Sequence, residues 1–132
     1  MQTFLPYPDF KKSAECLDKR RMWKQCVEAS QILNTLEGRS KGWSNHPATK
    51  MWSKNIDALK AYYNTFLAES LKRGIKVVKL QKKEVGDFTY PEWFSNSDFF
   101  ASHRSNLLRK DEVYYGQFGW SEPPNLEYVW PI

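Results

Sequence analysis

Apolar side chains recur every three to four residues over two long stretches of the chain, a spacing that is typical of amphipathic helices. In residues 10–37 the apolar positions that share one helical face are Met22, Cys26, Ala29, Leu33 and Leu36. Asp9 and Ser13 are suitable N-caps, and Gly38 is a typical residue just beyond a helix end. We therefore predict one long helix over residues 10–37, preceded by an extended arm, residues 1–9, that contains two prolines.

Two further helices are predicted in the rest of the chain. In residues 48–73 the same spacing links Trp52, Ile56, Leu59, Tyr63 and Phe66, and Gly74 ends this second helix. A third helix is predicted over residues 97–110, with Ser97 as its cap, followed by a further turn before Gly116. The remaining segments are a loop at 38–47, an extended link at 75–80, a connection at 81–96 and a tail at 121–132 across the core. The pattern predicts a compact all-α fold with three main helices and long connections.

The composition fits a single domain formed by residues 1–132. Aromatic residues make up 16% of the chain and can build a dense core from few side chains. We find no apolar run that approaches the roughly 20 residues of a membrane span, and no signal peptide at the start. Cys16 and Cys26 fall in the same predicted helix, about 15 Å apart, too far for a disulfide. We expect a cytoplasmic protein with free thiols.

Charge slightly favours a polyanionic partner, because the formal net charge is +5 and the isoelectric point is about 9.2. The first predicted helix carries Arg20, Lys24 and Glu28 at i, i+4 and i+8, with Arg21 beside them. One interpretation is a solvated face on which Lys24 and Glu28 form a pair, and the helix pattern alone favours it. The other is a carboxylate framed by cations, which acts in acid–base chemistry beside a phosphate backbone.

The loop sequence GWSNHP is a second candidate site. Trp43 lies between Gly and Ser and is a candidate stacking platform for a base, with Asn45 and His46 close by in the sequence. The alternative is a structural loop with a buried tryptophan and a capping asparagine. If the loop binds DNA, we expect Trp43 and His46 to border the same groove as Glu28.

The third predicted helix carries the third candidate site. Its polar and basic residues are Ser102, His103, Arg104, Ser105, Asn106, Arg109 and Lys110. On a helix, several of these fall on one small face that is able to hold phosphates, and the alternative is an ordinary wet face. The two histidines lack the HExxH spacing and a cysteine pair that zinc sites use, so we predict no metal site. The phosphate-binding and nucleophile motifs of nucleotide hydrolases and serine hydrolases are missing too.

Three segments together resemble the pyrimidine-dimer DNA glycosylases of the bacteriophage endonuclease V type. They are the helix LDKRRMWKQCVEASQIL, the segment from NHPATKMW to AESLKRG, and PEWFSNSDFFASHRSNLLRKDEVYYGQFGW. The resemblance covers roughly residues 1–120. It implies an all-α fold in which the N-terminal arm lies between helices. It also implies a basic face that binds double-stranded DNA, and a base that flips out of the stack.

The resemblance further implies a mechanism that needs no metal and no organic cofactor. An N-terminal α-amino group attacks C1′ of the damaged nucleotide, a glutamate in the first helix assists, and a Schiff base forms before β-elimination nicks the strand. The glutamate maps to Glu28 and the amine to Met1. Because Gln2 is bulky, we expect Met1 to be retained, and Lys24 is the alternative nucleophile. Val27 precedes Glu28 where the family has arginine, so other cations of this helix supply that charge.

We therefore expect a base-excision enzyme, a glycosylase with or without AP-lyase activity, which acts on damaged or modified pyrimidines in duplex DNA. Its expected DNA contacts are Arg20, Arg21, Trp43, Asn45, His46, His103, Arg104, Asn106, Arg109 and Lys110. We expect a monomer without a membrane partner, in the nucleoid or the cytoplasm of a phage-infected host. The alternatives are a non-catalytic DNA-binding domain of the same fold, and a small helical interaction protein that docks through its aromatic tail.

Overall fold

Six α-helices and two short 3-10 helices form the regular structure of this computed structural model, which describes residues 1–76 and 79–132. The α-helices are α1 (Phe10–Cys16), α2 (Lys19–Leu36), α3 (Pro47–Lys50), α4 (Ile56–Lys72), α5 (Ser97–Lys110) and α6 (Glu112–Tyr115). The 3-10 helices are η1 (Glu92–Ser95) and η2 (Gly116–Phe118). The described residues contain no strand, so the predicted all-α class is confirmed. The middle of the link predicted at 75–80 lies outside the described residues.

The single helix predicted over residues 10–37 is wrong, because the chain is extended at Leu17 and Asp18 between α1 and α2. Asp18 is the N-cap of α2, and its carboxylate accepts the backbone N–H of Arg21. Asp18 also accepts a hydrogen bond from the hydroxyl of Tyr115, which ties the start of α2 to α6. Cys16 consequently lies in α1, apart from Cys26 in α2, and both thiols are buried and free.

The second predicted helix is also divided in the structure. His46 caps α3 by accepting the N–H of Ala48 on its Nδ1 at 3.0 Å, and Pro47 occupies the first helical position. A turn follows α3, and Trp52 in this turn is fully buried. α4 begins only at Ile56, so the prediction of one helix over 48–73 was wrong in its first third.

The third helix was predicted correctly, since α5 spans Ser97–Lys110. Its cap is Asn96 instead of Ser97, because the Asn96 side chain accepts the N–H of Asp98 at 3.1 Å. The further turn of helix predicted after α5 is present as α6.

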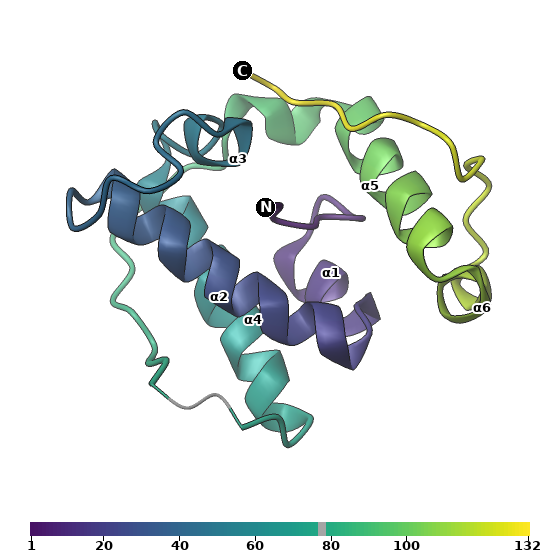
Figure 1. The fold of residues 1–132 in the computed structure, drawn as a ribbon, viewed down its shortest axis with the longest axis horizontal. Coiled ribbons are helices and arrows are strands. Elements are labelled where there is room, and N and C mark those ends of the chain that lie inside the picture. Colours follow the sequence, from purple (N-terminus) through teal and green to yellow (C-terminus); the bar gives the residue numbers. More distant parts are fainter. Residues whose placement is uncertain (77–78) are drawn as a thin grey trace.

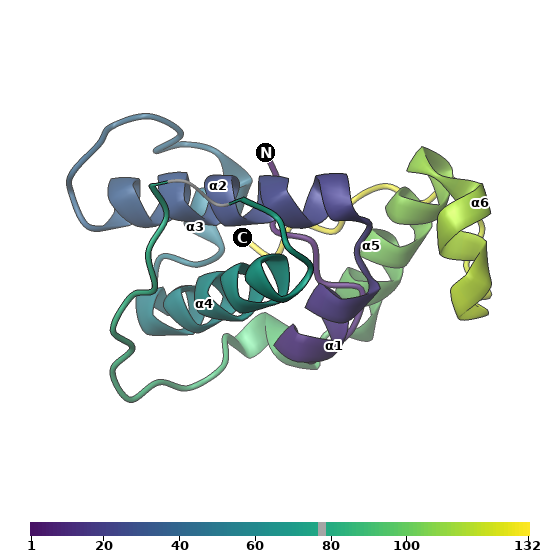
Figure 2. The ribbon, with the colours of Figure 1, turned by 90° about the horizontal axis from the view of Figure 1, so that it is seen from below.

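The N-terminal arm lies between α2 and α5, as the resemblance implied (Figure 1). α2 packs across α4, and the chain start lies on the α2 side of the molecule, away from α4 (Figure 2). Phe4 and Leu5 of the arm are buried in the core. Their backbone N–H groups donate to the side chains of Gln25 in α2 and His103 in α5. The arm is thus an internal element, held between two helices.

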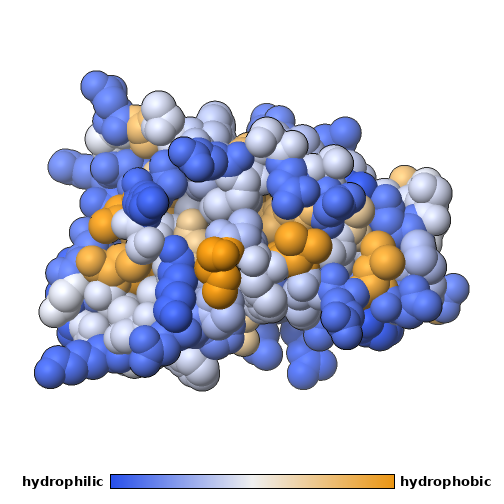
Figure 3. Space-filling model, turned by 90° about the horizontal axis from the view of Figure 1, so that it is seen from above, coloured by the Kyte–Doolittle hydropathy of each residue, from blue (hydrophilic) through white to orange (hydrophobic). Residues whose placement is uncertain are grey.

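The C-terminal tail runs beside α5 (Figure 1) and hydrogen-bonds polar side chains of this helix. Ser102 and Ser105 accept the backbone N–H groups of Val129 and Leu126 at 3.2 and 3.0 Å, and Asn106 donates to the Leu126 carbonyl at 3.1 Å. The predicted placement of the tail is therefore confirmed. Figure 3 shows separate small hydrophobic patches set among hydrophilic residues. Within the described ranges we find no helix with the length and apolar character of a membrane span.

Candidate active site

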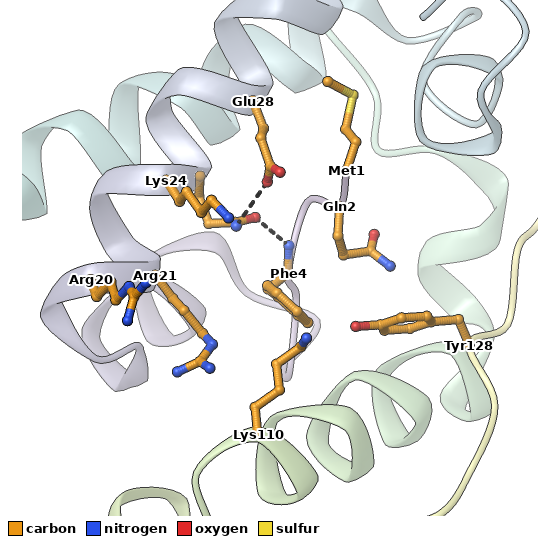
Figure 4. Close-up of a pocket in the computed structure, with 10 residues that line it drawn as sticks. Met1, Gln2, Phe4, Arg20, Arg21, Lys24, Glu28, Lys110 and Tyr128 are labelled. Atoms are coloured by element: carbon orange, nitrogen blue, oxygen red, sulfur yellow. Dashed lines mark hydrogen bonds between the residues drawn. The ribbon is translucent and has the colours of Figure 1, made fainter.

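A pocket of about 430 Å³ opens where the N-terminal arm, α2, the end of α5 and the tail meet (Figure 4). Its lining is dominated by polar and basic side chains: Met1, Gln2, Phe4, Arg20, Arg21, Lys24, Gln25, Glu28, Lys110 and Tyr128. Five residues of α2 line the pocket, and the helical spacing places them on one side, at 20, 24 and 28 and at 21 and 25. Met22 and Cys26 of the same helix are buried in the core. One helix thus supplies both core side chains and the wall of the pocket.

Glu28 is the half-buried carboxylate of this pocket, and it accepts a hydrogen bond from Gln25 Nε2 at 3.2 Å. Burial raises the pKa of Glu28 above its usual value. The α-amino group of Met1, the backbone N–H of Gln2 and the Lys24 ammonium oppose this rise of the pKa. A carboxylate with a raised pKa beside an amine is suited to accept a proton near neutral pH.

The α-amino group at the chain start lies near two titratable side chains of the site. Its charge lowers the pKa of Glu28 relative to burial alone, and it also lowers the pKa of His46, for which burial is the larger cause. Across residues 1–76 and 79–132, ion pairs within 4.0 Å do not include one between this amine and Glu28. The two groups therefore share the pocket without a direct ion pair between them.

Four cations line the pocket together with the Glu28 carboxylate, three from α2 and one from the end of α5 (Figure 4). Arg21 is paired with Asp18 at 3.2 Å, whereas Arg20, Lys24 and Lys110 have no ion-pair partner among the described residues. Burial lowers the pKa of Lys110, and repulsion from neighbouring cations, Arg21 first among them, lowers it further. The pocket therefore carries an excess of positive charge that a polyanion would neutralise.

The predicted catalytic residues Met1, Lys24 and Glu28 all line this pocket, together with three of the predicted DNA contacts. The Lys24–Glu28 pair of the first interpretation is not formed: Glu28 hydrogen-bonds Gln25 and makes no ion pair with Lys24 in the described part of the chain. The acid–base role of Glu28 stays a prediction.

The loop residues lie beside the pocket and do not line it. Trp43 is 53% exposed, with a backbone φ of 65°, and its ring meets the His46 ring edge-on at 5.8 Å between centroids. His46 in turn lies near the α-amino group, as its lowered pKa indicates. Asn45 is exposed. The alternative interpretation, a loop with a buried tryptophan, is therefore wrong for Trp43. That Trp43 and His46 border the same groove as Glu28 stays a prediction.

The exposed phosphate-binding face predicted on the third helix is wrong for most of its residues. His103 and Asn106 are fully buried, because the arm and the tail cover that side of α5. Arg104 is held by both carboxylate oxygens of Glu122, at 2.9 Å each, and donates to the Pro6 carbonyl. Arg109 is exposed and donates to Asn106, so it and Lys110 are the cations that α5 presents to solvent near the tail.

Four pocket residues were not predicted from the sequence: Gln2, Phe4, Gln25 and Tyr128. Gln25 lies three residues before Glu28, a spacing that places both on one helical face, so this residue had a usable signal. Tyr128 comes from an irregular tail, and nothing local in its sequence indicates that it reaches α2.

Comparison with known proteins agrees with this geometry. The family model described as pyrimidine dimer DNA glycosylase matches residues 1–83, which is more than half of the chain. The matched segment contains the arm and the whole of α2, and so includes Met1, Lys24 and Glu28. No curated protein and no solved structure matches the chain. The family is one of DNA-repair glycosylases that act on DNA, and this chain belongs to it: it is a member of the pyrimidine dimer DNA glycosylase family.

Proposed function

We propose that this protein excises damaged or modified pyrimidines from duplex DNA with the α-amino group of Met1 as nucleophile and Glu28 as its acid–base partner. The observation that carries this proposal is the meeting of a free amine, a carboxylate with a raised pKa and unpaired cations in one pocket. An amine that is uncharged at neutral pH is a competent nucleophile, and an α-amino group has an ordinary pKa of about 7.7–8.0, against about 10.4 for lysine.

In the proposed reaction the amine nitrogen uses its lone pair to form a bond to C1′ of the flipped nucleotide. The glycosidic bond breaks, and its electron pair leaves with the base, which takes up a proton. Glu28 accepts the proton that the amine loses, and its negative charge stabilises the positive charge that develops on the sugar. The nitrogen lone pair then opens the sugar ring, O4′ takes a proton, and an imine remains.

Strand cleavage follows from the imine without a further reagent. Loss of a proton from C2′ and breakage of the C3′–O bond leave an unsaturated sugar on one side and a phosphate on the other. Water then hydrolyses the imine and frees the amine. Glu28 is the one carboxylate among the described residues that line the pocket, so we assign both proton transfers to it.

Binding of the duplex is assigned to the cations around the pocket and to the neighbouring loop. Arg20, Arg21, Lys24 and Lys110 would neutralise phosphates on either side of the target nucleotide. Trp43, which is exposed beside His46, is positioned to stack on a base that borders the gap.

Borohydride trapping tests the covalent step. The protein is incubated with duplexes that carry a pyrimidine dimer, a modified pyrimidine or an abasic site, and sodium borohydride reduces any imine to a stable adduct. We expect a trapped protein–DNA adduct, and mass spectrometry of its peptides should place the DNA on the N-terminal residue. An adduct on Lys24 would show that the Lys24 amine is the nucleophile in place of the Met1 amine. DNA binding without any adduct or base release would favour a non-catalytic domain.

Glu28→Gln tests the acid–base role. The variant keeps the side-chain shape and an acceptor for Gln25 Nε2, so we expect the free energy of unfolding to change by about 0.5 kcal/mol or less. Single-turnover excision should fall by about 10²–10⁴-fold. DNA affinity, measured by gel shift, should stay the same or increase, because the substitution removes a negative charge from a pocket that binds phosphates. Unchanged excision by a folded variant would contradict the role of Glu28.

A further inference from the structure

Gln25 bonds to the N-terminal arm and to Glu28 through the two ends of one amide group (Figure 4). Its Oε1 accepts the backbone N–H of Phe4 at 2.7 Å, and its Nε2 donates to Glu28 Oε2 at 3.2 Å. The residue is 1% exposed. Gln25 therefore connects Glu28 to the arm that carries the N-terminal amine, and it has almost no exposed surface of its own for DNA.

The orientation of this amide is fixed by its neighbours. A backbone N–H can only donate, so the amide oxygen must face Phe4 and the NH₂ group must face Glu28. The hydroxyl of Tyr62 lies 3.2 Å from Gln25 Oε1 and 3.0 Å from the Phe4 carbonyl oxygen, and its single proton can be donated to either oxygen. A flipped amide would set N–H against N–H. The donor to Glu28 is thus a consequence of how the arm is held.

Other contacts fix the same stretch of the arm but do not reach the carboxylate. Trp52 Nε1 donates to the Thr3 hydroxyl at 3.0 Å, and the Leu5 N–H donates to His103 Nδ1 at 2.8 Å. These bonds hold the backbone of residues 3–5 on both sides of Phe4. Gln25 differs from them because it joins the arm to Glu28.

We propose that Gln25 is a positioning residue that sets the N-terminal amine and the Glu28 carboxylate in one fixed relation and supplies a hydrogen-bond donor to that carboxylate. The inference rests on the proposed function, since it assigns Gln25 a part in the reaction of that amine. Gln25 itself touches no reacting atom of the substrate in this scheme.

Glu28 is surrounded by charges from several elements, and each must be considered in a test by pH. The arm contributes the Met1 amine, α2 contributes Lys24, α5 contributes Lys110 and the tail contributes Tyr128. The pKa of the buried Tyr62 of α4 is raised by burial, and the negative charge of Glu28 raises it further. Burial raises the pKa of Glu28, whereas the Gln25 hydrogen bond and the amine lower it, so loss of the donor should raise the pKa further.

Gln25→Glu separates the two bonds of Gln25. The introduced carboxylate still accepts the Phe4 N–H, so the arm stays anchored, but it cannot donate to Glu28 when ionised. Two carboxyl groups at this separation share one proton, and the acidic limb of the pH–rate profile should move to higher pH by about one unit or more. Gln31→Glu is the matched control, because Gln31 is exposed on α2 and the same charge is added outside the pocket.

Gln25→Leu removes both bonds at once. We expect the single-turnover excision rate to fall by about 10–100-fold, because a small misplacement of reacting groups has effects of this size. DNA affinity should be unchanged, since the residue is buried. If this variant does not fold, the pH–rate profile of Gln25→Glu, compared with that of Gln31→Glu, tests the proposal by itself. A Gln25→Glu profile identical to that of Gln31→Glu, or a folded Gln25→Leu with wild-type rate, would overturn the proposal.

A direct titration distinguishes failure of this inference from failure of the proposed function. If the wild-type protein forms no borohydride adduct, the proposed function fails, whatever Gln25 does. The pKa of Glu28 can still be measured by NMR with carboxyl-labelled glutamate, and Glu28→Gln assigns its signal. A higher pKa in Gln25→Glu than in Gln31→Glu supports the hydrogen-bonded link between Gln25 and Glu28, and equal values overturn it.

Discussion

His103 is a buried histidine whose one hydrogen bond is made to the arm. Its Nδ1 accepts the Leu5 N–H at 2.8 Å, and within residues 1–76 and 79–132 its Nε2 has no partner. Burial lowers the pKa of His103 to about 3. The side chain is neutral at pH 7, and only the neutral ring can accept from the arm. His103 is therefore one of the side chains that hold the N-terminal arm in place through a hydrogen bond.

This geometry predicts that the protein loses stability in mild acid. The unfolded chain binds a proton at His103 below a pKa of about 6.5, whereas the folded chain does so only near 3. Between these values the unfolded state binds more protons, so the free energy of unfolding falls as the pH falls, by up to about 1.4 kcal/mol per pH unit. Urea unfolding at several pH values should show this slope.

His103→Gln serves as the comparison for that slope, because glutamine can accept a hydrogen bond and does not titrate. The variant should have a lower free energy of unfolding than wild type at pH 7. This difference should become smaller toward pH 4, because only the wild type loses stability through protonation of His103. A constant gap across this range would mean that His103 does not titrate on unfolding. Sequence alone gave no basis for this role, since a histidine on a helix face gives no sign of the arm and tail that cover it.

At the scale of elements, the break between α1 and α2 determines where the pocket wall begins. Asp18 caps α2, pairs with Arg21 and bonds the Tyr115 hydroxyl. These contacts lower the pKa of Asp18 although burial alone would raise it. The break starts α2 at Lys19, so that Arg20, Lys24 and Glu28 rise along one wall of the pocket.

We expect Asp18→Ala to lower the free energy of unfolding by about 1–2 kcal/mol, because the substitution removes the cap and leaves the buried Tyr115 hydroxyl without its acceptor. Asp18→Asn should lose less, since asparagine caps helices as well as aspartate does. Thermal unfolding of the two variants measures the difference. Equal losses would show that the charge of Asp18 matters and its capping does not.

Periodicity predicted the apolar faces of the helices better than it predicted their ends. The buried face of α2 was identified, because apolar residues that recur every three to four positions indicate which side of a helix faces the core. The breaks at Asp18 and after Lys50 were missed, since the apolar spacing was followed through both. The first break is stabilised by the local cap of Asp18 and by its tertiary contact with the Tyr115 hydroxyl, which the sequence does not show. α5 was predicted at its true bounds because no such contact interrupts it.

At the scale of the whole molecule, the pocket gathers charge from segments far apart in the sequence. Arg20 and Lys24 come from α2, whereas Lys110 comes from the end of α5 and Tyr128 from the tail. The α2 cations and Lys110 were identified as candidates from the sequence, because basic residues that lie close together along the chain can be recognised without a structure. The sequence could not show that these cations line one pocket with the N-terminal residue, which depends on how the arm and the tail pack.

If these cations bind DNA together, the affinity for duplex DNA should fall steeply with salt, by about 0.9 in the log–log slope for each phosphate neutralised. Arg20→Gln and Lys110→Gln remove single charges from opposite walls of the pocket, and each should make the slope shallower by about this amount. Lys72→Gln is the matched control, because Lys72 is an exposed cation of α4, outside the pocket. Binding titrations over a range of salt concentrations measure all three slopes. Equal reductions for Lys72 and the pocket cations would mean that DNA binds the basic protein without using this pocket, and a slope near zero in wild type would exclude phosphate contacts altogether.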